Sequence, residues 1–269
     1  MKTLLEILSD YKLNKKAIPA FNIDTFEIYQ AVEDAVRETN LPCIVQLSAG
    51  EDQFIQAERL FILVKKAQID GLPIYLNMDH GKDISRLEKA ANLGFEMLHF
   101  DGSTLDYKTN LTTAKAFIEN VKTNNSQIII EVEFNKIGAD LLTDPDQALE
   151  FMSQTKADLF AVSIGNQHGA DPSSPEKIDL NLLKQIAAKM PDTFLTLHGG
   201  SGIPSEDISA AIKLGVVKIN INTDLRIAFK QSLTSSLSSV NSEKIYEYFN
   251  PIIADLKEIV IQKLRQFYV

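Results

Sequence analysis

The chain alternates short apolar segments with longer amphipathic segments over nearly its whole length, and this alternation restricts its fold more than any other feature. The short segments are rich in β-branched residues and have the length of strands, whereas the longer ones carry apolar residues at helical spacing. The predicted strands are Ala17–Ile23, Pro42–Ser48, Pro73–Asp79, Glu96–Asp101, Gln127–Phe134, Asp158–Ile164, Thr193–His198 and Val216–Ile221. The predicted helices between and after them are Phe26–Thr39, Ala57–Ile69, Ile84–Leu93, Leu111–Lys122, Pro145–Gln154, Leu180–Lys189, Ser205–Leu214 and Thr223–Ser239.

This pattern predicts an α/β fold, a (β/α)8 TIM barrel with an additional C-terminal helix. Consecutive strand–helix units with near-continuous apolar strands are typical of a parallel sheet covered by helices. No Ser/Pro-rich linker or low-complexity tract interrupts them, so we expect residues 1–269 to form a single domain. An open doubly wound sheet is the alternative, but the units leave no obvious edge strand. The last predicted helix, Glu243–Gln266, would cap the barrel or reach a partner subunit.

Charge and hydropathy exclude several classes of partner. The formal net charge is −9, and the basic clusters are no longer than Lys15-Lys16 or Lys65-Lys66, which argues against a nucleic acid partner. No segment approaches the roughly 18 uninterrupted apolar residues of a membrane span, and the N-terminus MKTLLEILSDYKLNKK is interrupted by acidic residues where a signal peptide would continue apolar. The single cysteine, Cys43, excludes an internal disulfide and fits a reducing compartment. We therefore expect a cytoplasmic protein without a membrane partner.

Three of the four histidines lie at the ends of apolar segments beside glycine: His80 in LNMDHG, His168 in VSIGNQHG and His198 in TLHGGSGIP. In a (β/α)8 barrel the active site lies at the C-terminal ends of the strands. Imidazoles held there on separate strands predict a catalytic Zn²⁺ site with an open coordination position, the alternative being that each is a loop or capping histidine. We expect the fourth, His99 in EMLHF, to be a buried, hydrogen-bonded core residue.

A phosphate site is predicted beside these histidines. The run His198-Gly199-Gly200-Ser201-Gly202 carries three glycines, so bare main-chain N–H groups can approach an anion. The eighth strand ends in Asn220-Ile221-Asn222-Thr223-Asp224, which opens a helix whose N-terminus adds donors and a positive dipole. Loops after the seventh and eighth strands are the usual phosphate site of such barrels, so Gly200 and Ile221 count among the candidate contacts. Asn22 and Ser48, at other strand ends, are further candidates.

Six motifs resemble those of one enzyme family. They are LNMDHG, IGNQHG, LHGGSGIP and KININTDL, with IPAFNI near the start and FDGS after the fourth strand. Spread over nearly the whole chain, they resemble the motifs of the zinc-dependent class II ketose-bisphosphate aldolases. The resemblance implies cleavage of a phosphorylated ketose, fructose or tagatose 1,6-bisphosphate, to dihydroxyacetone phosphate and an aldehyde. It also implies a cytoplasmic homo-oligomer, for which we expect a homodimer or homotetramer.

The same resemblance implies roles for individual residues. His80, His168 and His198 would bind one Zn²⁺ per subunit, and Asp79 would be the catalytic acid/base. The dihydroxyacetone-phosphate end would contact Gly169, Gly199, Ser201, Asn220, Asn222 and Thr223. Asp101 and Glu133 match secondary, movable metal positions.

The chemistry of these residue types agrees with that implication. Breaking a carbon–carbon bond β to a ketone requires a Lewis acid at the ketone oxygen, which Zn²⁺ can supply. A carboxylate must take the proton of the C4 hydroxyl, and Asp79 follows a strand beside a metal candidate. The alternative role for Asp79 is to orient His80. An imidazole set favours Zn²⁺, although Co²⁺ or Mn²⁺ also fits.

The chain departs from the family pattern in two places. After Glu131-Val132-Glu133, family members carry a long glycine-rich acidic loop whose glutamate moves a proton to and from the enediolate carbon. Here that segment is shortened, and Asp140 is its only acid. After Gly169 the expected lysine is missing, and Asp171 stands nearby.

These departures leave other functions open. One is an aldolase-fold lyase or isomerase of different specificity, in which Asp140, Glu133 or a metal-bound water replaces the glutamate. Another is a weakly active paralogue that binds metal and sugar phosphate. The sequence does not distinguish fructose from tagatose substrates, and candidates for gripping the far end of the substrate are Arg226, Arg265 and Ser48.

Overall fold

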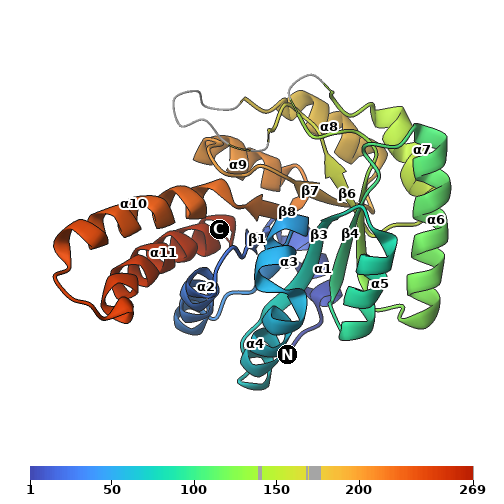
Figure 1. Ribbon diagram of the computed structural model, residues 1–269. Coiled ribbons are helices and arrows are strands. Elements are labelled where there is room, and N and C mark those ends of the chain that lie inside the picture. Colours follow the sequence, from blue (N-terminus) through green and yellow to red (C-terminus); the bar gives the residue numbers. More distant parts are fainter. Residues whose placement is uncertain (139–140, 168, 170–176, 269) are drawn as a thin grey trace.

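The computed structural model describes residues 1–138, 141–167, 169 and 177–268, and its centre is a closed parallel barrel in which strands β1 to β8 follow one another in sequence order (Figure 1). The strands are β1 Ile18–Asn22, β2 Cys43–Leu47, β3 Ile74–Gly81, β4 Met97–Asp101, β5 Ile129–Glu133, β6 Leu159–Val162, β7 Phe194–Leu197 and β8 Val216–Ile221. β1 pairs with β8, Ala20 lying opposite Asn220, and this pairing closes the barrel. The (β/α)8 prediction is therefore confirmed, and the open doubly wound sheet is wrong.

Helices surround the barrel, and most lie where the sequence predicted them. They are α1 Leu4–Asn14, α2 Phe26–Thr39, α3 Ala49–Ile55, α4 Ala57–Ile69, α5 Ile84–Leu93, α6 Tyr107–Asn124, α7 Pro145–Thr155, α8 Leu180–Lys189, α9 Ser205–Lys213, α10 Thr223–Ser239 and α11 Ile245–Tyr268. α6 begins four residues earlier than predicted because the Asp106 carboxylate caps it by accepting the Thr109 N–H. The helices that the structure describes all lack the length or the hydropathy that a membrane span requires.

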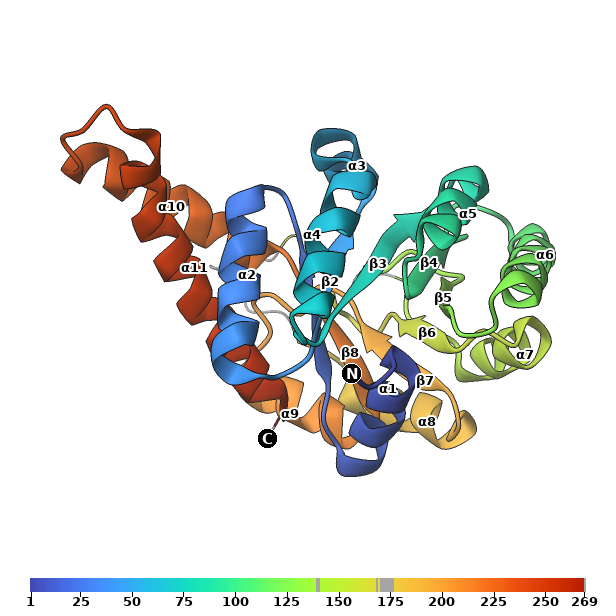
Figure 2. The ribbon, with the colours of Figure 1, turned by 90° about the horizontal axis from the view of Figure 1, so that it is seen from below.

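Helix α1, which was not predicted from the sequence, closes the bottom of the barrel. It begins at a capping box in which the side chains of Thr3 and Glu6 each accept the other's main-chain N–H. Its buried residues Leu8 and Tyr11 pack with inward-pointing strand residues such as Ile44 in a compact apolar cluster. Figure 2 shows the barrel from the side that α1 covers.

The inside of the barrel changes from apolar to polar along its axis. Near α1 the inward residues are Ile18, Ala20, Ile44, Tyr75, Met97, Ile129, Leu159 and Val217. Toward the C-terminal ends of the strands the buried residues are polar, among them Gln46, Asn77, Asp79, His99, Glu131, Thr196, His198, Lys218 and Asn220. A larger apolar cluster fills the space between the strands and the surrounding helices. The apolar layers thus support a polar layer at one end only.

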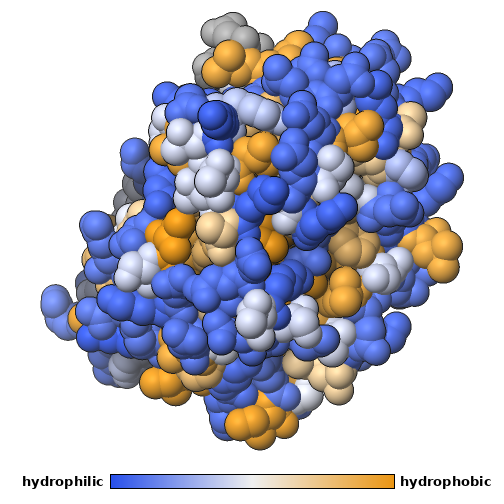
Figure 3. All heavy atoms as spheres, turned by 90° about the vertical axis from the view of Figure 1, so that its right-hand side faces the viewer, coloured by the Kyte–Doolittle hydropathy of each residue, from blue (hydrophilic) through white to orange (hydrophobic). Residues whose placement is uncertain are grey.

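Helix α11 does not cap the barrel. It packs against α2 and α10 on the outside, and the hairpin of α10 and α11 extends beyond the barrel wall (Figures 1 and 2). Its buried stripe includes Ile252, Leu256 and Val260. The alternative, a contact with a partner subunit, stays a prediction. The face over α5 to α7 is mostly hydrophilic, with scattered apolar side chains (Figure 3).

Candidate active site

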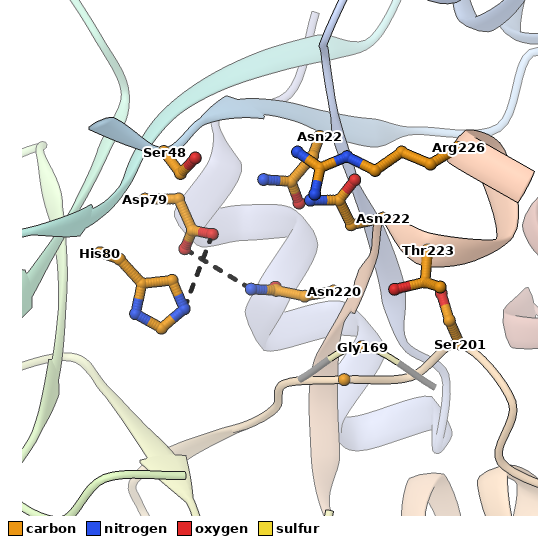
Figure 4. Close-up of a pocket in the computed structure, with 11 residues that line it drawn as sticks. Asn22, Ser48, Asp79, His80, Gly169, Ser201, Asn220, Asn222, Thr223 and Arg226 are labelled. Carbon is orange, nitrogen blue, oxygen red and sulfur yellow. Dashed lines mark hydrogen bonds and ion pairs between the residues drawn. The ribbon is translucent and has the colours of Figure 1, made fainter. Parts of the chain in front are cut away.

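The residues predicted from strand ends gather around one cavity of about 240 Å³ at the C-terminal end of the barrel. Its lining is Asn22, Ser48, Asp79, His80, Gly169, Gly199, Ser201, Asn220, Asn222, Thr223 and Arg226. Figure 4 shows the Asp79 carboxylate directed at both His80 and Asn220, with Arg226 reaching in from α10. Ten of these eleven residues are those proposed for substrate, metal or catalysis, and Arg226 was a candidate for the far end of the substrate. Predicted residues His168, Asp140 and Asp171 lie outside the described residues.

Two of the metal candidates face each other directly. His198 Nδ1 lies 3.0 Å from His80 Nε2. The other nitrogen of each ring faces a carboxylate: His198 Nε2 is 2.6 Å from Glu131 Oε1, and His80 Nδ1 is 3.4 Å from Asp101 Oδ2. Carboxylates that accept a ring N–H direct the opposite nitrogen at a metal, which is the usual outer environment of histidine ligands. The pair therefore fits a cation between its two inner nitrogens.

The protonation of this pair shows what a metal would replace. Burial lowers the pKa of His198 to about 3, although the Glu131 carboxylate opposes this, so the ring is neutral. Burial also lowers the pKa of His80, but the charge of Asp79 and the hydrogen bond to Asp101 outweigh it and raise the pKa to about 9. Without metal, a proton on His80 can therefore be shared with His198, and a divalent cation binding both nitrogens must displace it.

The main chain of His80 is strained. Its φ is 48°, in the left-handed region that a residue with a side chain seldom adopts, at a cost of roughly 1–2 kcal/mol. The pairing of β3 with β4 shifts register between Met78 and Gly81, so the strand leaves its regular course at this residue. The His80 N–H donates instead to His99 Nδ1 at 3.1 Å. Strain of this kind persists where surrounding contacts hold it, often at functional sites.

Asp79 is a buried, ionised carboxylate. Gln46 Nε2 donates to its Oδ2 at 3.1 Å, and Asn220 Nδ2 lies 3.5 Å from its Oδ1. Burial would raise the pKa of Asp79, but the positive charges of His80 and Lys218 hold it well below its usual range. Asp79 can therefore accept a proton at neutral pH.

The glycine loop after β7 is shaped by close packing. A side chain at Gly199 would place a Cβ 1.9 Å from the Gln167 carbonyl oxygen, and its φ is 65°, so glycine is required there. The Gly200 N–H donates to the Asn220 carbonyl at 2.9 Å and is already used within the fold. Ser201 Oγ accepts the Asp224 N–H at 3.1 Å, which joins this loop to the start of α10. The Ile221 side chain is fully buried in the outer apolar cluster.

Glu51 in α3 organises the mouth of the cavity, although the sequence analysis did not single it out. Its carboxylate accepts from Asn22 Nδ2 at 2.9 Å, Asn222 Nδ2 at 3.1 Å and Arg226 Nη2 at 2.8 Å. Arg226 also makes a two-point contact with Asp24, at 2.7 and 2.8 Å. The guanidinium is thereby fixed at the edge of the cavity.

A second cluster lies on the other side of His80. His80, Asp101 and Glu133 bring possible ligand atoms within 4.8 Å of one another. Burial raises the pKa of Glu133 well above its usual value, and the neighbouring Asp101 carboxylate adds to this. Asp101 and Glu133 were predicted as secondary metal positions, and the structure brings them together beside His80.

Other residues of the site were not given a role from sequence. His99 is fully buried and hydrogen-bonded, as expected. The centroid of its ring lies 4.8 Å from that of His80 and 5.0 Å from that of His198, so it also stands beside both metal candidates. Lys218 Nζ, also fully buried, donates to Glu131 Oε2 at 3.0 Å and Asn220 Oδ1 at 2.7 Å. The signal that could have found both is the strand period of two, counted back from Asp101 and Asn220.

Comparison with known proteins gives one consistent picture. A family model described as class-II fructose-bisphosphate aldolase matches residues 2–269. The chain is 34% identical over 243 residues to a fructose-bisphosphate aldolase of Mycoplasma genitalium, which covers 87% of this chain and 83% of that protein. It is 28% identical over 287 residues to a fructose-bisphosphate aldolase of Staphylococcus aureus, with 98% and 96% covered. The crystal structure of the YdjI aldolase from Escherichia coli K12 superimposes with a TM-score of 0.89 at 29% identity, over 99% of this chain and 97% of that one.

Proposed function

We propose, from the premise that this chain belongs to the class II fructose-bisphosphate aldolase family, that its metal is Zn²⁺ and that His80, His168 and His198 bind one ion per subunit. As a member of this family, the chain is a metal-dependent aldolase, a carbon–carbon lyase that acts on phosphorylated sugars. One observation carries the metal assignment: the two ring nitrogens of His80 and His198 lie 3.0 Å apart, with their opposite nitrogens turned to carboxylates. Neutral imidazoles are ligands well suited to Zn²⁺.

We propose Asp79 as the acid/base for the C4 hydroxyl of the ketose. When bound, Zn²⁺ would supply a Lewis acid for the ketone that accepts charge as the C3–C4 bond breaks. Asp79 is ionised, and Gln46 and Asn220 hold its two oxygens, so it can take the hydroxyl proton without reorienting. Its Oδ2 is 4.0 Å from His80 Nε2, which places the base beside the proposed metal.

The phosphate of the dihydroxyacetone phosphate half is proposed to bind between Gly199, Ser201 and the start of α10. Gly169, Asn220, Asn222 and Thr223 line the same cavity, and the N-terminus of α10 adds its dipole. The Gly200 N–H is engaged within the fold, so we assign the anion contacts to its neighbours. Gly200 then shapes the loop and Ile221 the strand, and we assign neither a contact with the phosphate.

At the far end, Arg226 is the group best placed for a second anionic group. It lines the cavity together with Asn22 and Ser48, and Glu51 and Asp24 fix its orientation. We therefore propose fructose or tagatose 1,6-bisphosphate as the substrate. The shortened segment after β5 keeps one alternative open, a lyase or isomerase of different sugar-phosphate specificity in which Glu133 carries the second proton.

We also propose that residues 1–269 act as a single domain in a cytoplasmic homodimer or homotetramer. One closed barrel with its outer helices supports the single domain. Exposed apolar side chains on the projecting hairpin, including Leu237, Ile245 and Tyr246, support contact with a second copy.

The experiment combines metal analysis with a panel of substrates. The purified protein should contain about one Zn²⁺ per chain and cleave a ketose 1,6-bisphosphate faster than a ketose 1-phosphate. His80→Ala, His168→Ala and His198→Ala should each lose most of the zinc and the cleavage activity. Lys115→Ala, which changes an exposed side chain on α6, serves as the control and should retain the zinc. Stoichiometric zinc in a folded His198→Ala protein would contradict the metal assignment.

A further inference from the structure

His99 lies at the centre of the candidate metal site, yet the proposed reaction gives it no task. It is fully buried, and the rings of His80 and His198 pack on it. Its Nδ1 is 3.3 Å from Asp79 Oδ1, and its Nε2 is 3.6 Å from Glu133 Oε2. A buried polar side chain in such a position is expected to make specific hydrogen bonds.

The clearest of these bonds is to the main chain of His80. β3 and β4 lose their regular register between Met78 and Gly81, at the point where His80 takes its left-handed φ of 48°. The His80 N–H points at His99 Nδ1, 3.1 Å away. The orientation of the His80 imidazole depends on the backbone conformation of His80. The hydrogen bond to His99 Nδ1 therefore helps to fix the direction in which that ring points.

This contact also selects the tautomer of His99. A ring nitrogen that accepts a hydrogen bond carries no proton, so the proton of neutral His99 lies on Nε2. There it faces Glu133 Oε2, and these two buried atoms have no closer hydrogen-bond partner in the part of the chain that the structure describes. The competing arrangement, with Nδ1–H directed at Asp79 Oδ1, has the longer separation, 3.3 Å against 3.1 Å.

We infer that His99 is a positioning residue for His80: its Nδ1 accepts the His80 main-chain N–H and holds the left-handed turn that aims the His80 imidazole at the metal. The inference rests on the proposed function, because it takes His80 as a ligand. It assigns His99 no contact with metal or substrate.

His99→Asn and His99→Gln both introduce a side-chain amide, and a comparison of the two separates the positioning role from simple filling of the core. In His99→Asn the amide oxygen can occupy the place of Nδ1, whereas in His99→Gln the amide lies near the place of Nε2 and the acceptor for His80 is lost. We expect His99→Asn to bind Zn²⁺ within about threefold of the unaltered protein and His99→Gln to bind roughly 10- to 100-fold more weakly, the range for outer groups that orient a ligand. Affinity is measured with Zn²⁺ alone, by competition with a chromogenic chelator.

Phe100→Leu provides the matched control. Phe100 is the next residue of β4, but its ring packs outward on Phe117, 5.8 Å away between centroids. This variant should lower the thermal unfolding midpoint and leave zinc affinity unchanged. Equal zinc affinity in His99→Asn and His99→Gln would overturn the positioning role.

Failure of the proposed function would look different. In that case the unaltered protein and His80→Ala would bind Zn²⁺ equally poorly, whichever residue occupies position 99.

If His99→Asn does not fold, ¹⁵N spectra of the imidazoles in the unaltered protein test the inference instead. We expect the shift of an unprotonated nitrogen at His99 Nδ1, and a protonated Nδ1 would overturn the inference.

Discussion

The substitution Glu131→Gln should damage both the stability and the metal site, for different reasons. Glu131 is fully buried, and its Oε2 accepts from Lys218 Nζ and from Thr196 Oγ1, both at 3.0 Å. Glutamine has the same shape but no charge, so Lys218 loses its counter-ion inside the barrel. Breaking a buried ion pair in this way costs about 3–5 kcal/mol, a large share of the roughly 5–15 kcal/mol by which native domains are stable. Asn220 Oδ1 still accepts from Lys218, which favours the lower end of this range.

The effect on the metal site comes from the tautomer of His198. Glu131 Oε1 accepts from His198 Nε2 at 2.6 Å, which leaves Nδ1 as the unprotonated nitrogen facing His80. In the Glu131→Gln variant the new amide would use its oxygen for Lys218 and Thr196 and so present its NH₂ group to His198. His198 Nε2 would then become the acceptor and Nδ1 would carry the proton, directed at the proposed metal position. We expect zinc affinity to fall at least 10- to 100-fold.

A second substitution separates the two effects. In the double variant Glu131→Gln, Lys218→Met, neither buried charge remains, and methionine fills the space of lysine. Stability of the metal-free protein, measured by urea unfolding, should return to within about 1 kcal/mol of the unaltered protein, because removing a whole buried pair is often neutral. Zinc affinity should stay low. The reasoning is refuted if Glu131→Gln alone costs less than about 1 kcal/mol, or if the double variant recovers zinc affinity.

Three further outcomes follow from the site. Asp79→Ala should retain zinc but lose about 10²-fold or more in kcat, since it removes a positioned proton-transfer group, and a fall in zinc affinity ahead of kcat would make Asp79 an orienting residue. Because a proton on His80, with a pKa of about 9, competes with metal, the apparent Kd for Zn²⁺ should rise about tenfold for each pH unit below 9, and calorimetry in buffers of different ionisation heat should detect the released proton. With no loop glutamate, solvent deuterium exchange into dihydroxyacetone phosphate should be slower than cleavage and should fall further in Glu133→Ala or Asp140→Ala. Exchange that outpaces cleavage and ignores both changes would contradict this view of the segment.

The fold was largely predictable because strand and helix periods alternate without interruption. The two helices that escaped prediction, α1 and α3, both carry a capping signal in the sequence. Thr3 stands three residues before Glu6, and Ser48 three before Glu51, and in the structure each glutamate accepts the N–H of its cap residue. α3 has only seven residues, too few for a periodic apolar pattern to stand out.

The polar layer beneath the site was less predictable. His99 and Lys218 lie within apolar strands, and sequence alone does not say that their side chains point into the barrel beside the metal candidates. The inward face follows once Asp101 and Asn220 are known to point inward, since alternate residues share a face. Hydrogen-bond partners cannot be read in this way. Glu131 meets His198 only because β5 and β7 approach across the barrel, and Glu51 meets Arg226 only because α3 and α10 share its rim.

The balance of buried charge explains why a divalent cation suits this site. Burial opposes ionisation of Asp79, Asp101 and Glu131, yet hydrogen bonds and nearby cations hold the pKa of each below its usual value, so all three are ionised. Glu133, whose pKa is raised, is neutral. Among the described residues of the polar layer, fully buried Lys218 offsets one of these charges, and the proton on His80 offsets another. A divalent cation that displaces this proton adds one positive charge to the buried layer, which an exchange for a monovalent ion would not do. Exposed Lys82, 3.6 Å from Asp101, is a further cation at the edge of the layer.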